Sequence, residues 1–131
     1  MRDSEVSVSG LSAIRVETEM SVSITKCLIK ESDDFGVHFL KGSVAALEAS
    51  LILSNKLPGV CIEEGANPQI SGNLIEGNGT GGVLIRQKGG GSIRYNVLRN
   101  NPAQFVAELP EAELHTVIED NTSNPANIHY Y

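Results

Sequence analysis

The hydrophobic positions of this chain recur with a period of 23 residues. An aliphatic pair follows a small residue at Cys27, Ser50, Asn73 and Asn96. A similar pair follows Thr116, only 20 residues after Asn96. Self-similarity at a fixed period is the signature of a repeat architecture. The pattern therefore predicts a stack of similar coils.

Each repeat contains three short apolar segments, of which the third is the aliphatic pair. Alternation of apolar and polar residues in the other two indicates strands with one face turned inward. In the first segment we expect the inward residues to be Ile14 and Val16, Val37 and Phe39, Val60 and Ile62, Val83 and Ile85, and Phe105 and Ala107. In the second we expect Val22 and Ile24, Ala45 and Leu47, Pro68 and Ile70, Gly91 and Ile93, and Ala112 and Leu114.

Three strands per repeat, with equivalent positions in register, predict an all-β fold of the parallel β-helix type. We expect a single domain over residues 1–131 with about five coils. The coils are expected over residues 10–32, 33–55, 56–78, 79–101 and 102–121, with 122–131 as a C-terminal cap or the start of a further coil. Because Glu5–Gly10 matches the end of a repeat, we expect the chain to be a fragment of a longer protein.

Two columns of small, mostly polar residues are predicted at the corners. Asparagine suits a corner because it tolerates the left-handed conformation and its amide bonds to turn backbone. The first column is expected to be Cys27, Ser50, Asn73, Asn96 and Thr116, and the second Ser32, Asn55, Asn78, Asn101 and Asn121. Gly36, Gly59 and Gly82 precede three first segments, where we expect corners with positive φ.

Composition narrows the possible functions. Of the 131 residues, 40% are hydrophobic but only 5% are aromatic, so the core should be aliphatic. The net charge of −6, without a basic cluster, argues against a nucleic-acid partner. We find no apolar run long enough for a membrane span and no signal peptide. The two cysteines do not make a disulfide framework. We therefore expect a cytoplasmic location.

The repeat resembles the CASH, pectate-lyase-like repeats of right-handed parallel β-helices. The similarity lies in Gly59-Val-Cys-Ile, Asn67-Pro-Gln-Ile and Asn73-Leu-Ile-Glu-Gly-Asn78. The similarity covers residues 10–121. Among proteins with such repeats, the chain most resembles the β-helix of F-box substrate receptors and of the Shc-binding protein family. The resemblance implies a right-handed, single-stranded β-helix. It specifies turns and core rather than chemistry.

In lyases and epimerases that the repeats resemble, the active site lies on the outward face of the first strand. On that face we expect one column of Arg15, His38, Cys61, Leu84 and Val106, and a second of Glu17, Leu40, Glu63, Arg86 and Glu108. A lyase would need several adjacent carboxylates and a base. Leu40 and Leu84 interrupt any polar groove, which favours a structural role for this face.

His38 and Cys61 should lie about one coil spacing apart. Such a pair can act as base and nucleophile, but no oxyanion donor or orienting group accompanies it. We therefore expect a surface pair without a catalytic role, and we assign no catalytic residue, metal or cofactor. Arg15, His38, Cys61, Glu63 and Arg86 remain an alternative ligand face, suited to a sugar.

The outward member of each aliphatic pair suggests a partner surface. The five residues are Leu28, Leu51, Leu74, Val97 and Val117. An exposed aliphatic stripe marks a protein interface or a self-association site, whereas burial of both Leu51 and Leu74 within one chain would exclude this. We expect a non-enzymatic interaction or scaffold domain that binds a protein partner or itself through this stripe or its open ends. The alternative is a carbohydrate-binding or polysaccharide lyase or epimerase-like β-helix.

Overall fold

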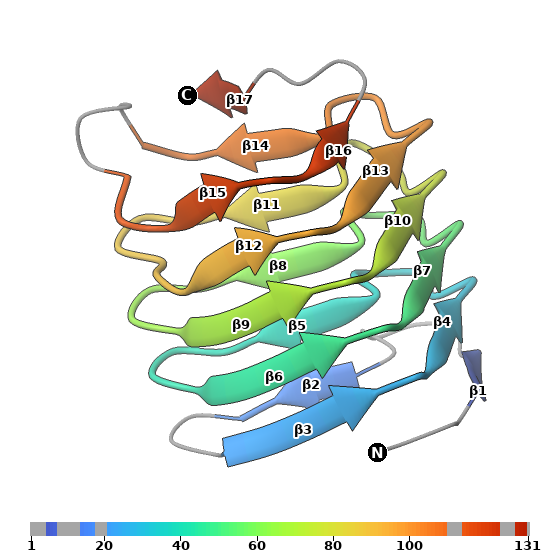
Figure 1. Ribbon diagram of the computed structural model, residues 1–131, viewed down its shortest axis with the longest axis horizontal. Helices are drawn as coiled ribbons and strands as arrows, with labels where there is room; N and C mark the ends of the chain where they lie inside the picture. The colour runs from blue at the N-terminus through green and yellow to red at the C-terminus, as the bar shows by residue number, and fades with distance from the viewer. Residues whose placement is uncertain (1–4, 8–13, 18–20, 110–113, 124–127, 131) are drawn as a thin grey trace.

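The chain folds as a parallel β-helix, as the repeat predicts. The computed structural model describes residues 5–7, 14–17, 21–109, 114–123 and 128–130. Successive strands wind around a common axis, and strands at equivalent positions of neighbouring coils pair in parallel (Figure 1). Among the described residues, no helix has the length and apolar character that a bilayer crossing requires.

Three parallel sheets line the coils. The first-strand sheet contains β2 (Ile14–Val16), β5 (Val37–Phe39), β8 (Val60–Ile62), β11 (Val83–Ile85), β14 (Phe105–Ala107) and β17 (Ile128–Tyr130). The second-strand sheet contains β3 (Ser21–Thr25), β6 (Val44–Glu48), β9 (Asn67–Ser71), β12 (Ser92–Arg94) and β15 (Val117–Glu119). The third-strand sheet contains β1 (Glu5–Ser7), β4 (Leu28–Lys30), β7 (Leu51–Leu53), β10 (Leu74–Glu76), β13 (Val97–Arg99) and β16 (Thr122–Ser123).

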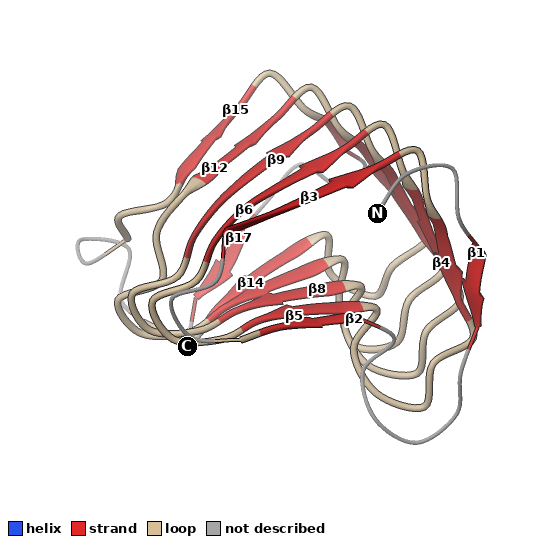
Figure 2. Cartoon of the chain, turned by 90° about the horizontal axis from the view of Figure 1, so that it is seen from below, coloured by secondary structure: helices blue, strands red, loops and turns tan. Residues whose placement is uncertain are grey.

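The cross-section of the coil is not a simple triangle. Viewed along the axis, the loops that join third strands to the next first strands extend beyond the plane of the first-strand sheet (Figure 2). These loops, such as residues 54–59 and 77–82, therefore border the outer face of that sheet. This arrangement places irregular backbone beside a flat strand surface, the usual location for binding residues.

The core consists of like residues stacked one coil above another. Ile29, Ile52 and Ile75 are fully buried and pair in register along the third-strand sheet. In the second-strand sheet Leu47 pairs with Ile70, and Ile70 with Ile93, as predicted. Packing of one aliphatic layer on the next buries apolar surface along the whole axis, which is the main favourable contribution to folding.

Two ladders of polar side chains hold the corners. In one, the backbone N–H of Cys27 donates to Ser50, that of Ser50 to Asn73, and that of Asn73 to Asn96, at 2.9–3.0 Å. In the other, Ser32 donates to Asn55, Asn55 to Asn78, and Asn78 to Asn101, at 2.9–3.1 Å. The amides also bond one another, since Asn55 Nδ2 lies 2.8 Å from Asn78 Oδ1. The buried asparagine amides of these ladders thereby find partners, as burial requires.

The left-handed positions at these corners lie one residue earlier than predicted. Positive φ is found at residues that directly precede a ladder residue, such as Tyr95 before Asn96 and Gly77 before Asn78. The ladder asparagines themselves are not among the residues with positive φ. The preceding residue turns the chain, so that the asparagine side chain can point along the axis and bond to the neighbouring coil.

The predicted positive φ at Gly36, Gly59 and Gly82 is also wrong. None of them lies in the left-handed region. A Cβ on Gly36 would lie 2.6 Å from the carbonyl oxygen of Gly59, and one on Gly59 would lie 2.9 Å from Asn78 Nδ2. Glycine is required here because the neighbouring coil and the asparagine ladder approach the backbone closely.

The last coil departs from the predicted register. The segment Val117–Glu119 forms the second strand of its coil, because Ile118 pairs with Ile93. The repeat pattern predicts a third strand here, with Thr116 above Asn96, and this prediction is wrong. Instead Asn121 accepts the N–H of Asn96 at 3.0 Å and continues the first ladder, 25 residues on. Ala112 lies outside the described residues, and Leu114 is not in a strand.

Beyond Asn121 the coil pattern continues. Thr122 pairs with Val97 in the third-strand sheet, and Ile128 pairs with Phe105 in the first-strand sheet. At the other end, Val6 pairs with Ile29, one period later, as the repeat predicts. The strands at both ends thus follow the same winding as the central coils.

Replacement of a central ladder residue should destabilise the fold strongly. Asn78→Ala removes the acceptor of two hydrogen bonds from Asn55 and the donor to the Ile52 carbonyl, all buried. Unpaired buried polar groups cost about 1–3 kcal/mol each, so the three groups left unpaired should lower the free energy of unfolding by about 3 kcal/mol or more. Urea denaturation followed by circular dichroism measures this difference.

Asn67→Ala is the matched control, because Asn67 is exposed and lies outside both ladders. Its effect on the free energy of unfolding should stay within about 0.5 kcal/mol. Equal losses in the two variants would contradict a special role for the ladder.

Candidate functional site

The outer face of the first-strand sheet carries the two predicted outward columns. Strand pairing places His38 between Arg15 and Cys61, and Leu84 between Cys61 and Val106. In the second column, the backbone N–H groups of Leu40, Glu63, Arg86 and Glu108 each bond to the coil before them. The register of both columns is therefore as predicted.

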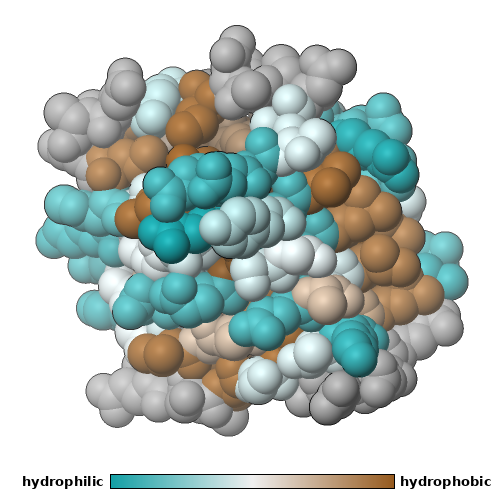
Figure 3. Space-filling model, in the orientation of Figure 1, coloured by the Kyte–Doolittle hydropathy of each residue, from teal (hydrophilic) through white to brown (hydrophobic). Residues whose placement is uncertain are grey.

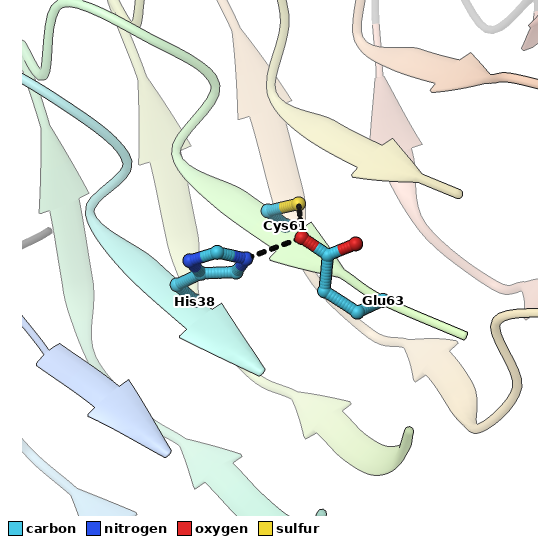
Figure 4. A group of neighbouring side chains, drawn as sticks. All are labelled: His38, Cys61 and Glu63. Atoms are coloured by element: carbon cyan, nitrogen blue, oxygen red, sulfur yellow. Dashed lines mark hydrogen bonds and ion pairs between the residues drawn. The ribbon is translucent and has the colours of Figure 1, made fainter. Parts of the chain in front are cut away.

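Glu63 is the centre of a cluster of polar side chains on this face. Its Oε2 atom lies 2.5 Å from His38 Nε2 and 2.8 Å from Arg86 Nη1. The Cys61 thiol donates to the same oxygen at 3.7 Å (Figure 4). The side chains of His38 and Glu63 are only 14% and 18% exposed, so these charge-assisted contacts are partly shielded from water.

Cys61 points outward from the β-helix but is fully buried. Phe35, from the loop before β5, covers it together with Leu84, and Val106 packs against them. These residues form a second, smaller apolar cluster outside the main core. Burial raises the pKa of the Cys61 thiol well above its usual range, and the negative charge of Glu63 raises it further. The thiol is therefore protonated and is a weak nucleophile.

A hollow of about 540 Å³ lies beside this cluster. We call it the first-strand hollow; its lining residues are Phe35, Leu57, Pro58, Thr80, Leu84, Arg86, Val106 and Glu108. The loops that extend past the first-strand sheet supply one wall, and the outward side chains of β11 and β14 supply the floor. Arg86 and Glu108 are the charged groups among the lining residues, and Arg86 Nε lies 3.8 Å from Glu108.

Phe35 is the residue of this site whose role the sequence analysis missed. Its ring lies 5.8 Å from the Arg86 guanidinium and 4.9 Å from the His38 ring. It thus connects the polar cluster to the hollow. A signal was present in the repeat: the equivalent positions in later coils are Pro58, Gly81 and Ala103, so the aromatic ring departs from its column.

The aliphatic stripe lies on the outer face of the third-strand sheet. Leu28, Leu51, Leu74 and Val97 pair in register and form one ladder there, which we call the aliphatic ladder. Leu51 is 42% exposed and Val97 is 36% exposed, while Leu28 and Leu74 are half-buried. Hydrophobic surface gathers over this sheet, on the right of Figure 3. Leu51 and Leu74 are therefore not both buried within the chain.

Val117 does not belong to the aliphatic ladder, contrary to the prediction. It pairs with Ser92 in the second-strand sheet, where it is 42% exposed. The place above Val97 is taken by Thr122. This correction follows from the shifted register of the last coil.

The fold and its ladders define the class of this protein as a parallel β-helix. A comparison with family models matches residues 1–128 to the right-handed beta helix region. The chain therefore belongs to the right-handed β-helix family, and the predicted fold class is confirmed. Comparison with curated proteins and with solved structures gives no significant match. The closer resemblances to F-box receptors and to Shc-binding proteins stay predictions.

The buried thiol of Cys61 should resist alkylation in the folded protein. Only a thiolate attacks iodoacetamide, and the raised pKa keeps Cys61 protonated at about pH 8. We expect no modification of Cys61 in the native chain and complete modification after unfolding in guanidinium, measured by peptide mass spectrometry. A cysteine introduced at exposed Gln69 is the reactive control. Alkylation of native Cys61 as fast as this control would contradict the assignment.

Proposed function

We propose that this chain is a non-enzymatic β-helix module that binds a protein partner through the outer face of its third-strand sheet. The observation that carries the proposal is the aliphatic ladder, with Leu51 and Val97 its most exposed members. Exposed apolar side chains gathered on one face mark interaction surfaces, whereas isolated ones do not.

The geometry of this face suits an interface. Its strands are spaced by about 4.8 Å, so the aliphatic ladder extends over roughly 15 Å along the axis. A standard interface buries about 800 Å² per partner, and the ladder would occupy its apolar centre. Polar residues of the same face would form the rim, among them Glu76 and Arg99, which are paired at 3.0 Å. Because the surface is a rigid sheet, ordering it costs little entropy on binding.

The chemistry of the other candidate surface, on the first-strand sheet, supports a non-enzymatic role. A Cys–His nucleophile needs a thiolate, but the pKa of Cys61 is raised by burial. His38 is bonded to Glu63 rather than to the thiol, and Glu63 is also engaged by Arg86. The side chains of His38 and Arg86 are both bonded to Glu63, so these three groups are engaged with one another rather than with a substrate.

A charge introduced into the aliphatic ladder should weaken partner binding strongly without affecting the fold. Candidate partners are captured from cell extract, identified and purified, and their affinities are then measured by calorimetry. Leu51→Glu should weaken binding by at least about tenfold, because a carboxylate would be buried against an apolar surface. Sedimentation velocity of the purified chain identifies a second copy as the partner if Leu51→Glu dissociates an oligomer.

Val117→Glu is the matched control for this experiment. Val117 and Leu51 have the same exposure of 42% but lie on different sheets. The control variant should bind the partner as the wild-type chain does. Equal affinities of the two variants, or equal losses, would place the binding surface elsewhere.

A second candidate function is sugar binding in the first-strand hollow. Its volume of about 540 Å³ falls in the range typical of small-molecule sites. Arg86 and Glu108 could bond to hydroxyl or carboxylate groups of a saccharide, and the apolar wall could contact a sugar ring. Glycan-array binding that Arg86→Gln abolishes and Leu51→Glu retains would favour this candidate over the protein interface.

A further inference from the structure

We propose that His38, Cys61 and Glu63 form a binding site for a zinc ion. One ligand atom of each residue, a ring nitrogen of His38, Cys61 Sγ and a carboxylate oxygen of Glu63, lies within 4.8 Å of the other two. The side chains converge from β5 and from β8 with the residue that follows it, as Figure 4 shows. The site departs from the sequence prediction, which assigned no metal, and it is independent of the proposed partner surface.

The spacing of the three atoms is close to that of a tetrahedral site. Zinc binds nitrogen and oxygen at about 2.0–2.1 Å and sulfur at about 2.3 Å, so ligand atoms around it are roughly 3.3–3.8 Å apart. The Cys61 Sγ to Glu63 Oε2 distance of 3.7 Å already falls in that range. The His38 Nε2 to Glu63 Oε2 distance of 2.5 Å must open by about 1 Å as the ion replaces the proton between them.

The donor set favours zinc over the common hard cations. Calcium and magnesium prefer oxygen ligands alone, whereas a thiolate and an imidazole together suit zinc. A bound zinc ion deprotonates its coordinating thiol, and the proton passes to solvent. The three protein ligands leave one tetrahedral position for a water molecule.

The surrounding structure holds the ligands in place. Cys61 and His38 are neighbours in the register of β8 and β5, and Glu63 follows Cys61 by two residues on the same face. The ring of Phe35 lies against His38 and restricts its orientation. Rigid strands and a packed side chain thus limit the rearrangement that binding would require.

Arg86 competes with the zinc ion for Glu63, because its guanidinium Nη1 already donates to Glu63 Oε2 at 2.8 Å. Its side chain is 40% exposed, and its Nε lies 3.8 Å from Glu108, which offers an alternative partner. Zinc binding must displace Arg86 from Glu63 toward Glu108. Removal of the Arg86 charge should therefore tighten metal binding, a consequence specific to this geometry.

Cobalt substitution tests the site with the metal alone as the probe. The full chain is reduced, stripped of metal with a chelator and titrated with Co²⁺. We expect a thiolate-to-cobalt charge-transfer band in the near ultraviolet that saturates at one equivalent and disappears on addition of one equivalent of Zn²⁺. The band reports sulfur coordination and is not produced by carboxylates or histidines on the surface.

Variants assign the ligands. Cys61→Ser should remove the charge-transfer band, and His38→Gln and Glu63→Gln should each weaken cobalt binding by at least about tenfold. Cys27→Ser is the matched control, since Cys27 is the other buried cysteine and lies in a corner ladder. That variant should retain the band. Arg86→Gln should bind cobalt at least about tenfold more tightly than the wild-type chain.

The absence of a charge-transfer band in the wild-type chain at saturating Co²⁺ would overturn the proposal, whatever the variants do. A band that persists in Cys61→Ser, or that disappears in Cys27→Ser while the circular dichroism spectrum is unchanged, would overturn it too. Weaker binding by Arg86→Gln would contradict the competition between the arginine and the ion.

Discussion

The register between successive coils is the constraint on which the rest of this structure depends. At two corners of the coil, a backbone N–H donates to the side chain of the residue one repeat later, and the amides of neighbouring coils bond to one another. A shift by one residue would leave these buried groups unpaired and would turn the inward side chains outward. The corners therefore fix the register that the aliphatic core then stabilises.

Because the register is fixed, each outward column becomes a continuous strip of surface. The third-strand sheet presents aliphatic residues in consecutive coils, and the result is one apolar ladder rather than scattered side chains. On the first-strand sheet the outward residues differ from coil to coil, so that His38, Cys61 and Glu63 meet at one place. The same scaffold thus separates a uniform surface from a chemically mixed one, on different faces.

The mixed surface also shows how a loop alters a column. Cys61 projects from the outer face of a strand, yet Phe35 covers it and lowers the local dielectric constant. This burial raises the pKa of the thiol and shields the contacts that Glu63 makes with His38 and Arg86. The hollow beside them exists because the same loops extend past the sheet. Chemistry on this face is therefore decided by the loops as much as by the strands.

The sequence alone determined the coil type, the strand positions in the regular repeats and the residues of the core columns. It also determined which residues form the outward columns of the first-strand and third-strand sheets. The exception is the last coil. These follow from a period of 23 residues, since identical spacing brings identical positions into register. The tertiary structure decided what the period does not encode. An irregular spacing before β15 moved Val117 to another sheet, because Ile118 could fill the core column above Ile93 and Asn121 could bond to Asn96. Burial of Cys61 and the meeting of His38 with Glu63 depend on side-chain packing between coils, 23 to 25 residues apart in the chain. The 23-residue repeat does not predict such contacts. It specifies the position of a residue in its column, but not which side chains pack over it.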